Sequence, residues 1–206
     1  MFKKKKYTVI RQAISKDLAN FVANYFRMQK QVYDTCRQAR YFSPFENIIG
    51  HYENDNEQIP NTYSQYANMA METLLLKCQP GMEKATGLKL YPAYTYARIY
   101  KKGDELKRHK DRFSCEISTT MNLAGDDWPI YLEPSGETGK KGVKVDLKQG
   151  DMLVYSGCEL EHWREKFKGK ECVQVFLHYN NRKTPGSKDN MFDKRPHLGL
   201  PSWFKR

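Results

Sequence analysis

The spacing of hydrophobic residues changes near residue 88, and this change divides the chain into two parts. In the first part these residues recur every three or four positions, which is the spacing of one face of an α-helix. Residues 15–38 therefore predict a long helix, with the Ser15 side chain as its N-cap. The residues predicted for its apolar face are Leu18, Phe21, Val22, Tyr25 and Phe26.

Turn residues and apolar spacing predict the rest of this first part. Residues 7–14 alternate in character and predict a short strand. Residues 40–62 combine proline, glycine and many polar side chains, so they predict a long loop. A second helical region is expected over residues 62–87, with an interruption near Pro80 and an end at Gly87.

After residue 88 the chain has short runs rich in tyrosine and β-branched residues, separated by glycine, asparagine and aspartate turns. Such runs are typical of strands. Residues 88–100 predict one long strand or a strand pair, and further strands are expected within residues 115–123, 128–134, 142–157 and 171–180. Helices followed by many short strands favour an α+β fold, with helices packed on a β-sandwich or jelly roll.

Length and pattern together predict one domain over residues 1–206. Its parts are a mainly helical N-terminal support over residues 1–87, a β core over residues 88–182 and an irregular tail over residues 183–206. The loop at residues 40–62 and the tail are candidates for covering a site on the core, because long loops in compact domains often do so.

Composition narrows the class of protein. Hydrophobic residues make up 39% of the chain, enough for a core, and an aromatic content of 13% argues against disorder. The formal net charge of +11 suits a nucleic-acid or acidic partner, or simply a soluble basic surface. Most of the lysines are scattered, so the charge favours the soluble basic surface.

The cysteines and the termini give an expectation for location. The five cysteines contain no C-x-x-C pair and have irregular spacing, so a reducing compartment fits better than a disulfide framework. No apolar run reaches membrane-spanning length, and no secretory signal is visible. We therefore expect a cytoplasmic protein with no membrane contact.

Three residues have the types and spacing of a metal site. His109 and Asp111 lie two positions apart, where a strand directs both side chains to one face, and His162 follows a later strand and turn. Two imidazoles and one carboxylate form the facial triad of non-haem Fe(II) oxygenases. Two alternatives are a solvated turn pair and a zinc site with Cys115 or Cys158, whose spacing matches no usual zinc pattern.

The context of these residues resembles a known family. The stretches "YKKGDELKRHKD", "KQGDMLVYSG" and "EHWREKFKGKECVQVFLHY" are similar to those of Fe(II)- and 2-oxoglutarate-dependent dioxygenases of the prolyl 4-hydroxylase type. The resemblance covers about residues 90–182. It implies a double-stranded β-helix (jelly-roll) core with the N-terminal helices packed on one face. It also implies that His109, Asp111 and His162 bind iron.

The resemblance further implies a basic residue that binds the distal carboxylate of 2-oxoglutarate. In this family it stands at the start of the last core strand. Lys170 has this place, eight positions after His162 (170 minus 162), and is our prediction. Lys168 and Arg164 are the alternatives.

Hydroxyl groups are also implied near the co-substrate. Tyr100 matches a tyrosine that precedes the H-x-D motif in the family, although a core tyrosine is an equally good interpretation. Thr119 or Thr120, on the strand after that motif, can supply a further hydroxyl, but the pattern does not fix which of the two faces the site.

The activity implied by the resemblance is hydroxylation with O₂ and 2-oxoglutarate, releasing succinate and CO₂, often with ascorbate as a reductant. Prolyl residues of a protein or peptide are the first expected substrate. The net charge keeps two alternatives open: a nucleic-acid-directed hydroxylase or demethylase, and a non-catalytic basic module that binds nucleic acid. The intact set of three ligands argues against the non-catalytic module.

Overall fold

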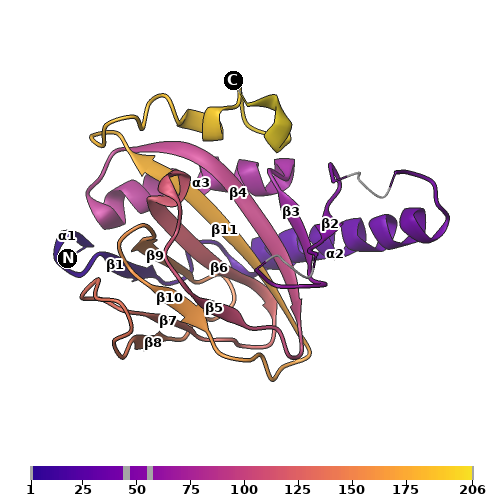
Figure 1. The fold of residues 1–206 in the computed structure, drawn as a ribbon, viewed down its shortest axis with the longest axis horizontal. Coiled ribbons are helices and arrows are strands. Elements are labelled where there is room, and N and C mark those ends of the chain that lie inside the picture. The colour runs from indigo at the N-terminus through magenta and orange to yellow at the C-terminus, as the bar shows by residue number, and fades with distance from the viewer. Residues whose placement is uncertain (1, 44–46, 55–57, 206) are drawn as a thin grey trace.

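The core of the molecule consists of two antiparallel sheets that face each other (Figure 1). The computed structural model describes residues 2–43, 47–54 and 58–205. Its strands are β1 (Tyr7–Ile10), β2 (His51–Tyr52), β3 (Tyr63–Tyr66), β4 (Leu90–Lys101), β5 (Leu106–His109), β6 (Ile117–Gly125), β7 (Ile130–Leu132), β8 (Val143–Val145), β9 (Met152–Ser156), β10 (His162–Arg164) and β11 (Glu171–Asn181). The larger sheet has the order β1-β9-β6-β11-β4-β3-β2, and the smaller sheet has the order β5-β10-β7-β8.

Eight of these strands, four from each sheet, form the jelly roll: β9, β6, β11 and β4 face β5, β10, β7 and β8. Every predicted core strand lies within this set, and residues 88–100 contribute one long strand that pairs with β11 along its whole length. The predicted fold class, an α+β protein with a double-stranded β-helix core, is confirmed.

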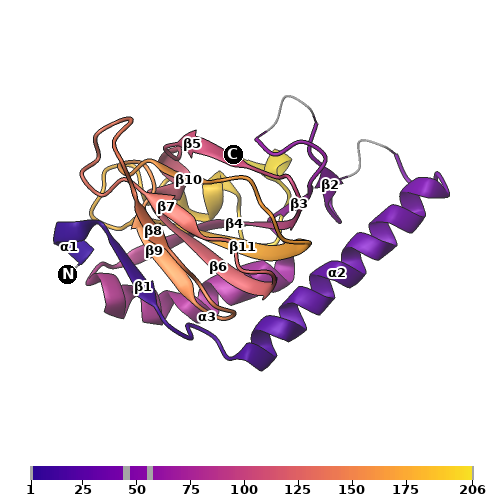
Figure 2. The ribbon, with the colours of Figure 1, turned by 90° about the horizontal axis from the view of Figure 1, so that it is seen from below.

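The helices are α1 (Phe2–Lys5), α2 (Lys16–Gln38) and α3 (Met69–Thr86), with 3₁₀ turns η1 (Phe113–Cys115), η2 (Met191–Lys194) and η3 (Ser202–Phe204). Helices α2 and α3 lie on the outer face of the larger sheet (Figure 2). The main hydrophobic core lies between these helices and the sheet. Smaller apolar clusters lie between the inner faces of the two sheets, next to a cavity.

Helix α2 begins as predicted, because the Ser15 side chain accepts a hydrogen bond from the Leu18 N–H at 3.2 Å. The predicted apolar face is only partly buried. Val22 and Phe26 pack into the core, whereas Phe21 and Tyr25 are 70% and 39% exposed. The prediction was wrong for these two residues because the helix carries two apolar stripes and the sheet covers only one.

The second helical region differs from its prediction at two points. Residues 63–66 form strand β3 instead of a helical turn, and Pro80 lies inside α3 without ending it. Proline at this position removes the hydrogen bond to the carbonyl of Leu76. Leu76 lies on the exposed side of the helix, where water can bind that carbonyl. The helix ends at Gly87 as predicted, with the left-handed φ of 71° that favours glycine.

The loop and the tail contain little regular structure in the described ranges. The loop at residues 40–62 includes the short strand β2, and its residues 44–46 and 55–57 lie outside the described residues. The tail folds into η2 and η3 and is held to the core by the ion pair between Asp193 and Arg112, at 2.9 Å.

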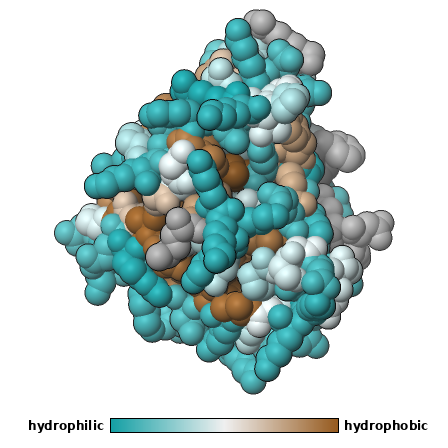
Figure 3. Space-filling model, turned by 90° about the vertical axis from the view of Figure 1, so that its left-hand side faces the viewer, coloured by the Kyte–Doolittle hydropathy of each residue, from teal (hydrophilic) through white to brown (hydrophobic). Residues whose placement is uncertain are grey.

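The surface is largely hydrophilic, as expected for a chain with 29% charged residues. The face shown in Figure 3 is covered mostly by hydrophilic side chains, with hydrophobic ones in patches between them. None of the helices in the described part of the chain has the length and apolar character that a membrane span requires.

Substitution of two phenylalanines of α2 tests which of its two apolar stripes stabilises the fold. Phe26 is fully buried, so Phe26→Ala should lower the free energy of unfolding by about 3–5 kcal/mol. Phe21→Ala, on the exposed stripe of the same helix, should change it by less than about 0.5 kcal/mol. Urea unfolding of the two variants measures this, and equal effects would contradict the packing described.

Candidate metal centre

Three side chains converge where the smaller sheet opens toward the larger one. Strand β5 ends at His109 and β10 begins at His162, and the antiparallel register pairs these two residues directly. Their ring centroids lie 4.3 Å apart. Asp111 follows β5, and its Oδ1 lies 3.7 Å from His109 Nε2 and 3.5 Å from His162 Nε2. All three potential ligand atoms lie within 4.8 Å of one another.

Backbone carbonyls fix the orientation of both imidazole rings. Nδ1 of His109 lies 2.7 Å from the carbonyl of Lys107, and Nδ1 of His162 lies 3.1 Å from the carbonyl of Leu160. A carbonyl can only accept, so each Nδ1 carries the proton and donates it. In the neutral ring, Nε2 then keeps its lone pair, and in both rings it points toward Asp111. This tautomer is the one that binds a metal through Nε2.

The position of Asp111 is fixed by its neighbours. Its N–H donates to the carbonyl of Gly157 at 2.9 Å, and the Ser118 hydroxyl donates to its Oδ2 at 2.7 Å. Residue 157 has to be glycine, because a Cβ there would lie 2.3 Å from Asp111 Oδ2 and 2.4 Å from the carbonyl of Cys115. The backbone of Gly157 therefore packs directly against the carboxylate.

The charge state of the cluster suits a cation. Burial alone would raise the pKa of Asp111, but hydrogen bonding and charge from His162, with His178 and Ser118, leave that pKa below its ordinary value. Burial, together with His162, lowers the pKa of His109. At neutral pH the site therefore presents an ionised carboxylate and a neutral His109 imidazole.

A second cluster, Asp111 with Cys115 and His178, also has ligand atoms within 4.8 Å. Its polar atoms have protein partners. The Ser118 hydroxyl lies 3.0 Å from His178 Nδ1 as well as close to Asp111, and Cys115 Sγ lies 3.0 Å from the hydroxyl of Tyr94. We interpret Cys115 and His178 as neighbours that help to position Asp111, and not as ligands of a second metal site. Cys158 belongs to neither cluster of the described residues, so this placement gives no support to a zinc site that uses it.

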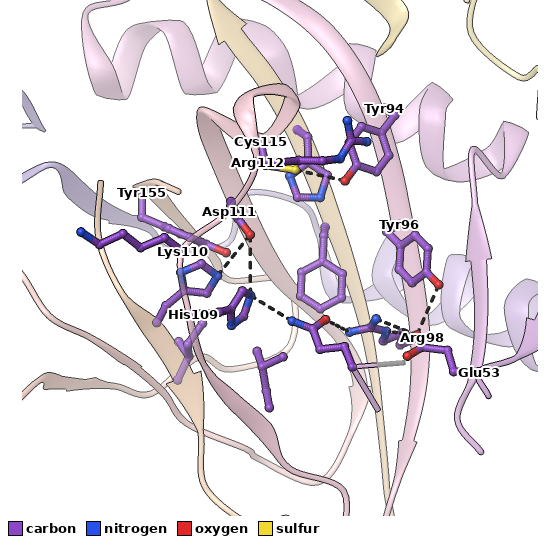
Figure 4. A pocket seen from close by; sticks show the side chains of 16 residues that line it. Glu53, Tyr94, Tyr96, Arg98, His109, Lys110, Asp111, Arg112, Cys115 and Tyr155 are labelled. Atoms are coloured by element: carbon purple, nitrogen blue, oxygen red, sulfur yellow. Dashed lines mark hydrogen bonds and ion pairs between the residues drawn. The ribbon is translucent and has the colours of Figure 1, made fainter. Parts of the chain in front are cut away.

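The triad opens into a cavity of about 460 Å³ between the sheets (Figure 4). The walls include the aromatic residues Tyr94, Tyr96 and Phe176. Two residues of the loop at 40–62, Glu53 and Gln58, also line it.

The loop residues are held by Arg98 on β4, which no sequence pattern singled out. Arg98 forms an ion pair with Glu53 at 2.6 Å and donates to Gln58 Oε1 at 2.8 Å. Gln58 Nε2 in turn lies 3.0 Å from His109 Nε2. A single arginine thus connects the loop to the edge of the triad.

Lys170, predicted to bind the distal carboxylate of 2-oxoglutarate, lies on the outside of the molecule. Its side chain is exposed, and its N–H donates to Asp126 Oδ2 at 2.6 Å. Lys168 is exposed as well. The inward-facing position at the start of β11 belongs to Cys172, which is fully buried. The placement therefore gives no support to either lysine.

Arg164, the remaining alternative, lies inside the barrel and is 0% exposed. It stands two positions after His162 on β10, so it shares the inner face of the strand. It donates to the carbonyl of Trp128, and its Nη2 lies 3.0 Å from Thr120 Oγ1 and 3.5 Å from Gln174 Oε1. All of these partners are neutral, so the charge of Arg164 is not balanced by a carboxylate of the described residues.

Two buried polar atoms beside Arg164 lack partners. Arg164 Nε and the Tyr100 hydroxyl are both buried without a hydrogen-bond partner among the described residues. The ring of Trp128 contacts both residues, 5.0 Å from the Arg164 guanidinium and 4.8 Å from the Tyr100 ring. Thr120 faces this group, whereas the Thr119 hydroxyl accepts from the Leu177 N–H at 3.0 Å. The strand register thus places Thr120, and not Thr119, beside Arg164.

Comparison with known proteins gives the fold a context. No protein-family model and no curated protein matches the chain. Among solved structures, a prolyl-4-hydroxylase from Pseudomonas putida has a TM-score of 0.61 and 15% identity over 88% of this chain and 95% of that chain.

Two further structures are similar to a comparable degree. The non-haem α-ketoglutarate-dependent epimerase SnoN of nogalamycin biosynthesis has a TM-score of 0.63 and 11% identity over 87% of this chain and 79% of that chain. HygX from Streptomyces hygroscopicus, solved with nickel, 2-oxoglutarate and hygromycin B, has a TM-score of 0.59 and 11% identity over 88% of this chain and 85% of that chain. The chain has the fold of the Fe(II)- and 2-oxoglutarate-dependent oxygenases. The resemblance inferred from the sequence is thus confirmed at the level of the fold.

The pH dependence of stability tests whether His178, close to Asp111, is buried in its neutral form. Burial lowers the pKa of His178 to about 4, from an ordinary value of 6.5. The fold holds the neutral imidazole, so its contribution to stability is complete above pH 6.5 and is lost as the pH falls toward 4. Between pH 7 and pH 5 the metal-free protein should lose about 2 kcal/mol through this residue.

Urea unfolding at the two pH values compares the wild type with His178→Asn, which keeps a donor but does not titrate. The exposed His197→Asn serves as the matched control. The pH dependence should become shallower only in His178→Asn. The same slope in all three proteins would contradict a buried neutral His178.

Proposed function

We propose that this chain is an Fe(II)- and 2-oxoglutarate-dependent dioxygenase that hydroxylates its substrate. The observation that carries the proposal is the convergence of His109, Asp111 and His162, with their potential ligand atoms within 4.8 Å, at the mouth of a cavity in this fold. Two imidazole nitrogens and one carboxylate oxygen are the donor set of the 2-His-1-carboxylate iron site.

The residues present fit the metal. Both Nδ1 protons are held by backbone carbonyls, so the Nε2 atoms of the two rings and one ionised carboxylate oxygen face the same point. When bound, iron would use O₂ and 2-oxoglutarate to hydroxylate a C–H bond, with release of succinate and CO₂. The chain's own task is to hold the ligands in place and to orient the substrate in the cavity.

The side-chain amide of Gln58 occupies the lone pair of His109 Nε2. Its amide donates to that nitrogen, which is the atom that faces the metal. A metal ion takes the same lone pair, so metal binding requires the Gln58 amide to turn away. Arg98 and Glu53, which hold the same loop, keep Gln58 at the edge of the cavity.

For the co-substrate, we propose Arg164 in place of Lys170, with Tyr100 and Thr120 beside it. A buried guanidinium without a counter-charge is costly, and an anion that enters the barrel relieves that cost. The unpartnered Nε of Arg164 and the hydroxyl of Tyr100 are donors that suit a carboxylate. The distal carboxylate of 2-oxoglutarate is such an anion.

For the substrate, prolyl residues of a protein or peptide are our first candidate. The support is the family resemblance, the fold shared with a prolyl-4-hydroxylase and the aromatic walls of the cavity, which suit the apolar ring of proline. The intact triad argues against a non-catalytic module.

Nucleic acid is the second candidate, because a basic groove lies beside the site. It shares Leu106 with the cavity, and four cations exceed two carboxylates in its lining: Lys107, Arg108, Lys140 and Lys141 against Glu105 and Glu165. Clustered cations suit a phosphate backbone. An assay with both substrate classes separates the two candidates.

Removing a ligand should abolish turnover. We expect Asp111→Ala and His162→Ala to lose Mn(II) binding in calorimetry, and to lose succinate production with Fe(II), 2-oxoglutarate and ascorbate. His197→Ala, an exposed histidine of the tail, should match the wild type. Succinate release by either ligand variant at the wild-type rate would remove the metal assignment.

The same assay identifies the substrate class. Proline-containing peptides should raise succinate release above the uncoupled level, and mass spectrometry should show the addition of one oxygen atom to the peptide. Stimulation by oligonucleotides alone would replace the prolyl proposal with the nucleic-acid one and leave the metal assignment intact.

Arg164→Met tests the co-substrate site. With Mn(II) present, this variant should bind 2-oxoglutarate at least about 30-fold more weakly than the wild type, because the carboxylate loses its charged partner. Lys170→Met should change the affinity by less than about twofold, since that side chain lies outside. Calorimetry measures both, and 2-oxoglutarate should raise the melting temperature of Lys170→Met but not of Arg164→Met. The reverse pattern would restore Lys170.

A further inference from the structure

Helix α2 carries a second apolar stripe that the fold does not use. Phe21, Tyr25, Met28 and Val32 are 70%, 39%, 65% and 50% exposed, although four large apolar side chains in one row are unusual on the surface of a monomer. The helix lies along the outside of the molecule (Figure 2). Asn68 Nδ2 lies 3.3 Å from the Tyr25 hydroxyl and helps to fix that side chain.

Apart from Asp17 in the first turn, the surroundings of the stripe are uncharged. At 100° per residue, the neighbours on its outer side, away from the core, are polar but neutral: Asn20, Asn24, Gln31, Thr35 and Gln38. On its inner side are Leu18, Gln29 and Cys36.

After the first turn, the charged residues of α2 all lie on the other half of the helix. They are Arg27, Lys30, Asp34 and Arg37. In a chain with 29% charged residues, half of a long surface helix thus carries a single charged residue, Asp17 in its first turn. Depletion of charge around apolar side chains is the compositional mark of a protein interface.

The spacing of the stripe points to its partner. The steps of four, three and four residues are those of a coiled-coil seam, which packs against a helix of the same period. The sequence of steps is also the same in both directions. An antiparallel copy of the same helix therefore meets it with Phe21 opposite Val32 and Tyr25 opposite Met28, as a two-fold interface requires.

We propose that two copies of this chain associate through this stripe, with α2 antiparallel to α2 of the second copy. Each copy carries a net charge of +11, so copies repel one another over most of their surface, and a face with almost no charge allows close approach. The Tyr25 ring and the Met28 thioether form a favourable pair at the centre. A contact of two helices is small, so we expect a dissociation constant in the micromolar range. The inference is independent of the proposed function.

Sedimentation equilibrium of the full chain tests the association. The average mass should rise from monomer to dimer between roughly 1 and 100 μM. Met28→Glu, which places a charge at the centre of the seam, should raise the dissociation constant at least about 100-fold. Val143→Glu is the matched control, since Val143 is 40% exposed on β8 and the charge change is the same.

Three outcomes would overturn the proposal. They are a monomer at every concentration, a dimer that Met28→Glu leaves unchanged, and a mass that rises only when a different protein is added. Circular dichroism of the variants shows whether they are folded, and the wild-type measurement alone decides the first outcome.

Engineered cysteines test the antiparallel arrangement. In a background with Cys36→Ser and Cys158→Ser, the double variant Tyr25→Cys/Met28→Cys should form a disulfide-linked dimer under mild oxidation at least about tenfold faster than either single variant. Only the double variant places two thiols opposite each other. Equally fast cross-linking of the single variant Tyr25→Cys would indicate parallel pairing and contradict the proposal.

Discussion

The antiparallel pairing of β5 with β10 is the contact on which the site depends. It places His109, the last residue of β5, opposite His162, the first residue of β10, so that two imidazoles separated by 53 positions (162 minus 109) share one edge of the smaller sheet. The carbonyls of Lys107 and Leu160 then select the tautomer of each ring. Asp111 completes the set because the Gly157 backbone and the Ser118 hydroxyl hold its carboxylate at the same edge.

The two faces of the larger sheet differ in what they pack against and in how polar they are. Its outer face binds α2 and α3 and contains most of the apolar core, which supplies the stability. Its inner face contains buried polar groups, including Arg98, Thr120 and Gln174. Strand β11 shows this division, since Val173, Val175 and Leu177 face the helices while Cys172 and Phe176 face the barrel. Polar groups that would destabilise a core are kept here because they face the cavity or one another.

The sequence predicted what depends on local spacing and failed where a three-dimensional neighbour decides. His109 and Asp111 were found because a step of two residues is the period of a strand, and His162 because of the motif around it. Lys170 was chosen by counting positions from His162, but its side chain is exposed, whereas Arg164 is buried inside the barrel. No spacing rule reveals Gln58, because its place at His109 depends on Arg98 from a distant strand. Phe21 was assigned to the core because a helical period cannot tell which of two apolar stripes a sheet covers.

A crystal structure with Mn(II) and an unreactive analogue of 2-oxoglutarate tests the central claim most directly. The account predicts one metal ion bound by Nε2 of His109, Nε2 of His162 and Oδ1 of Asp111, with the distal carboxylate of the analogue on Arg164. A metal ion bound instead by Cys115 and His178, or no metal at the end of β5, would contradict it.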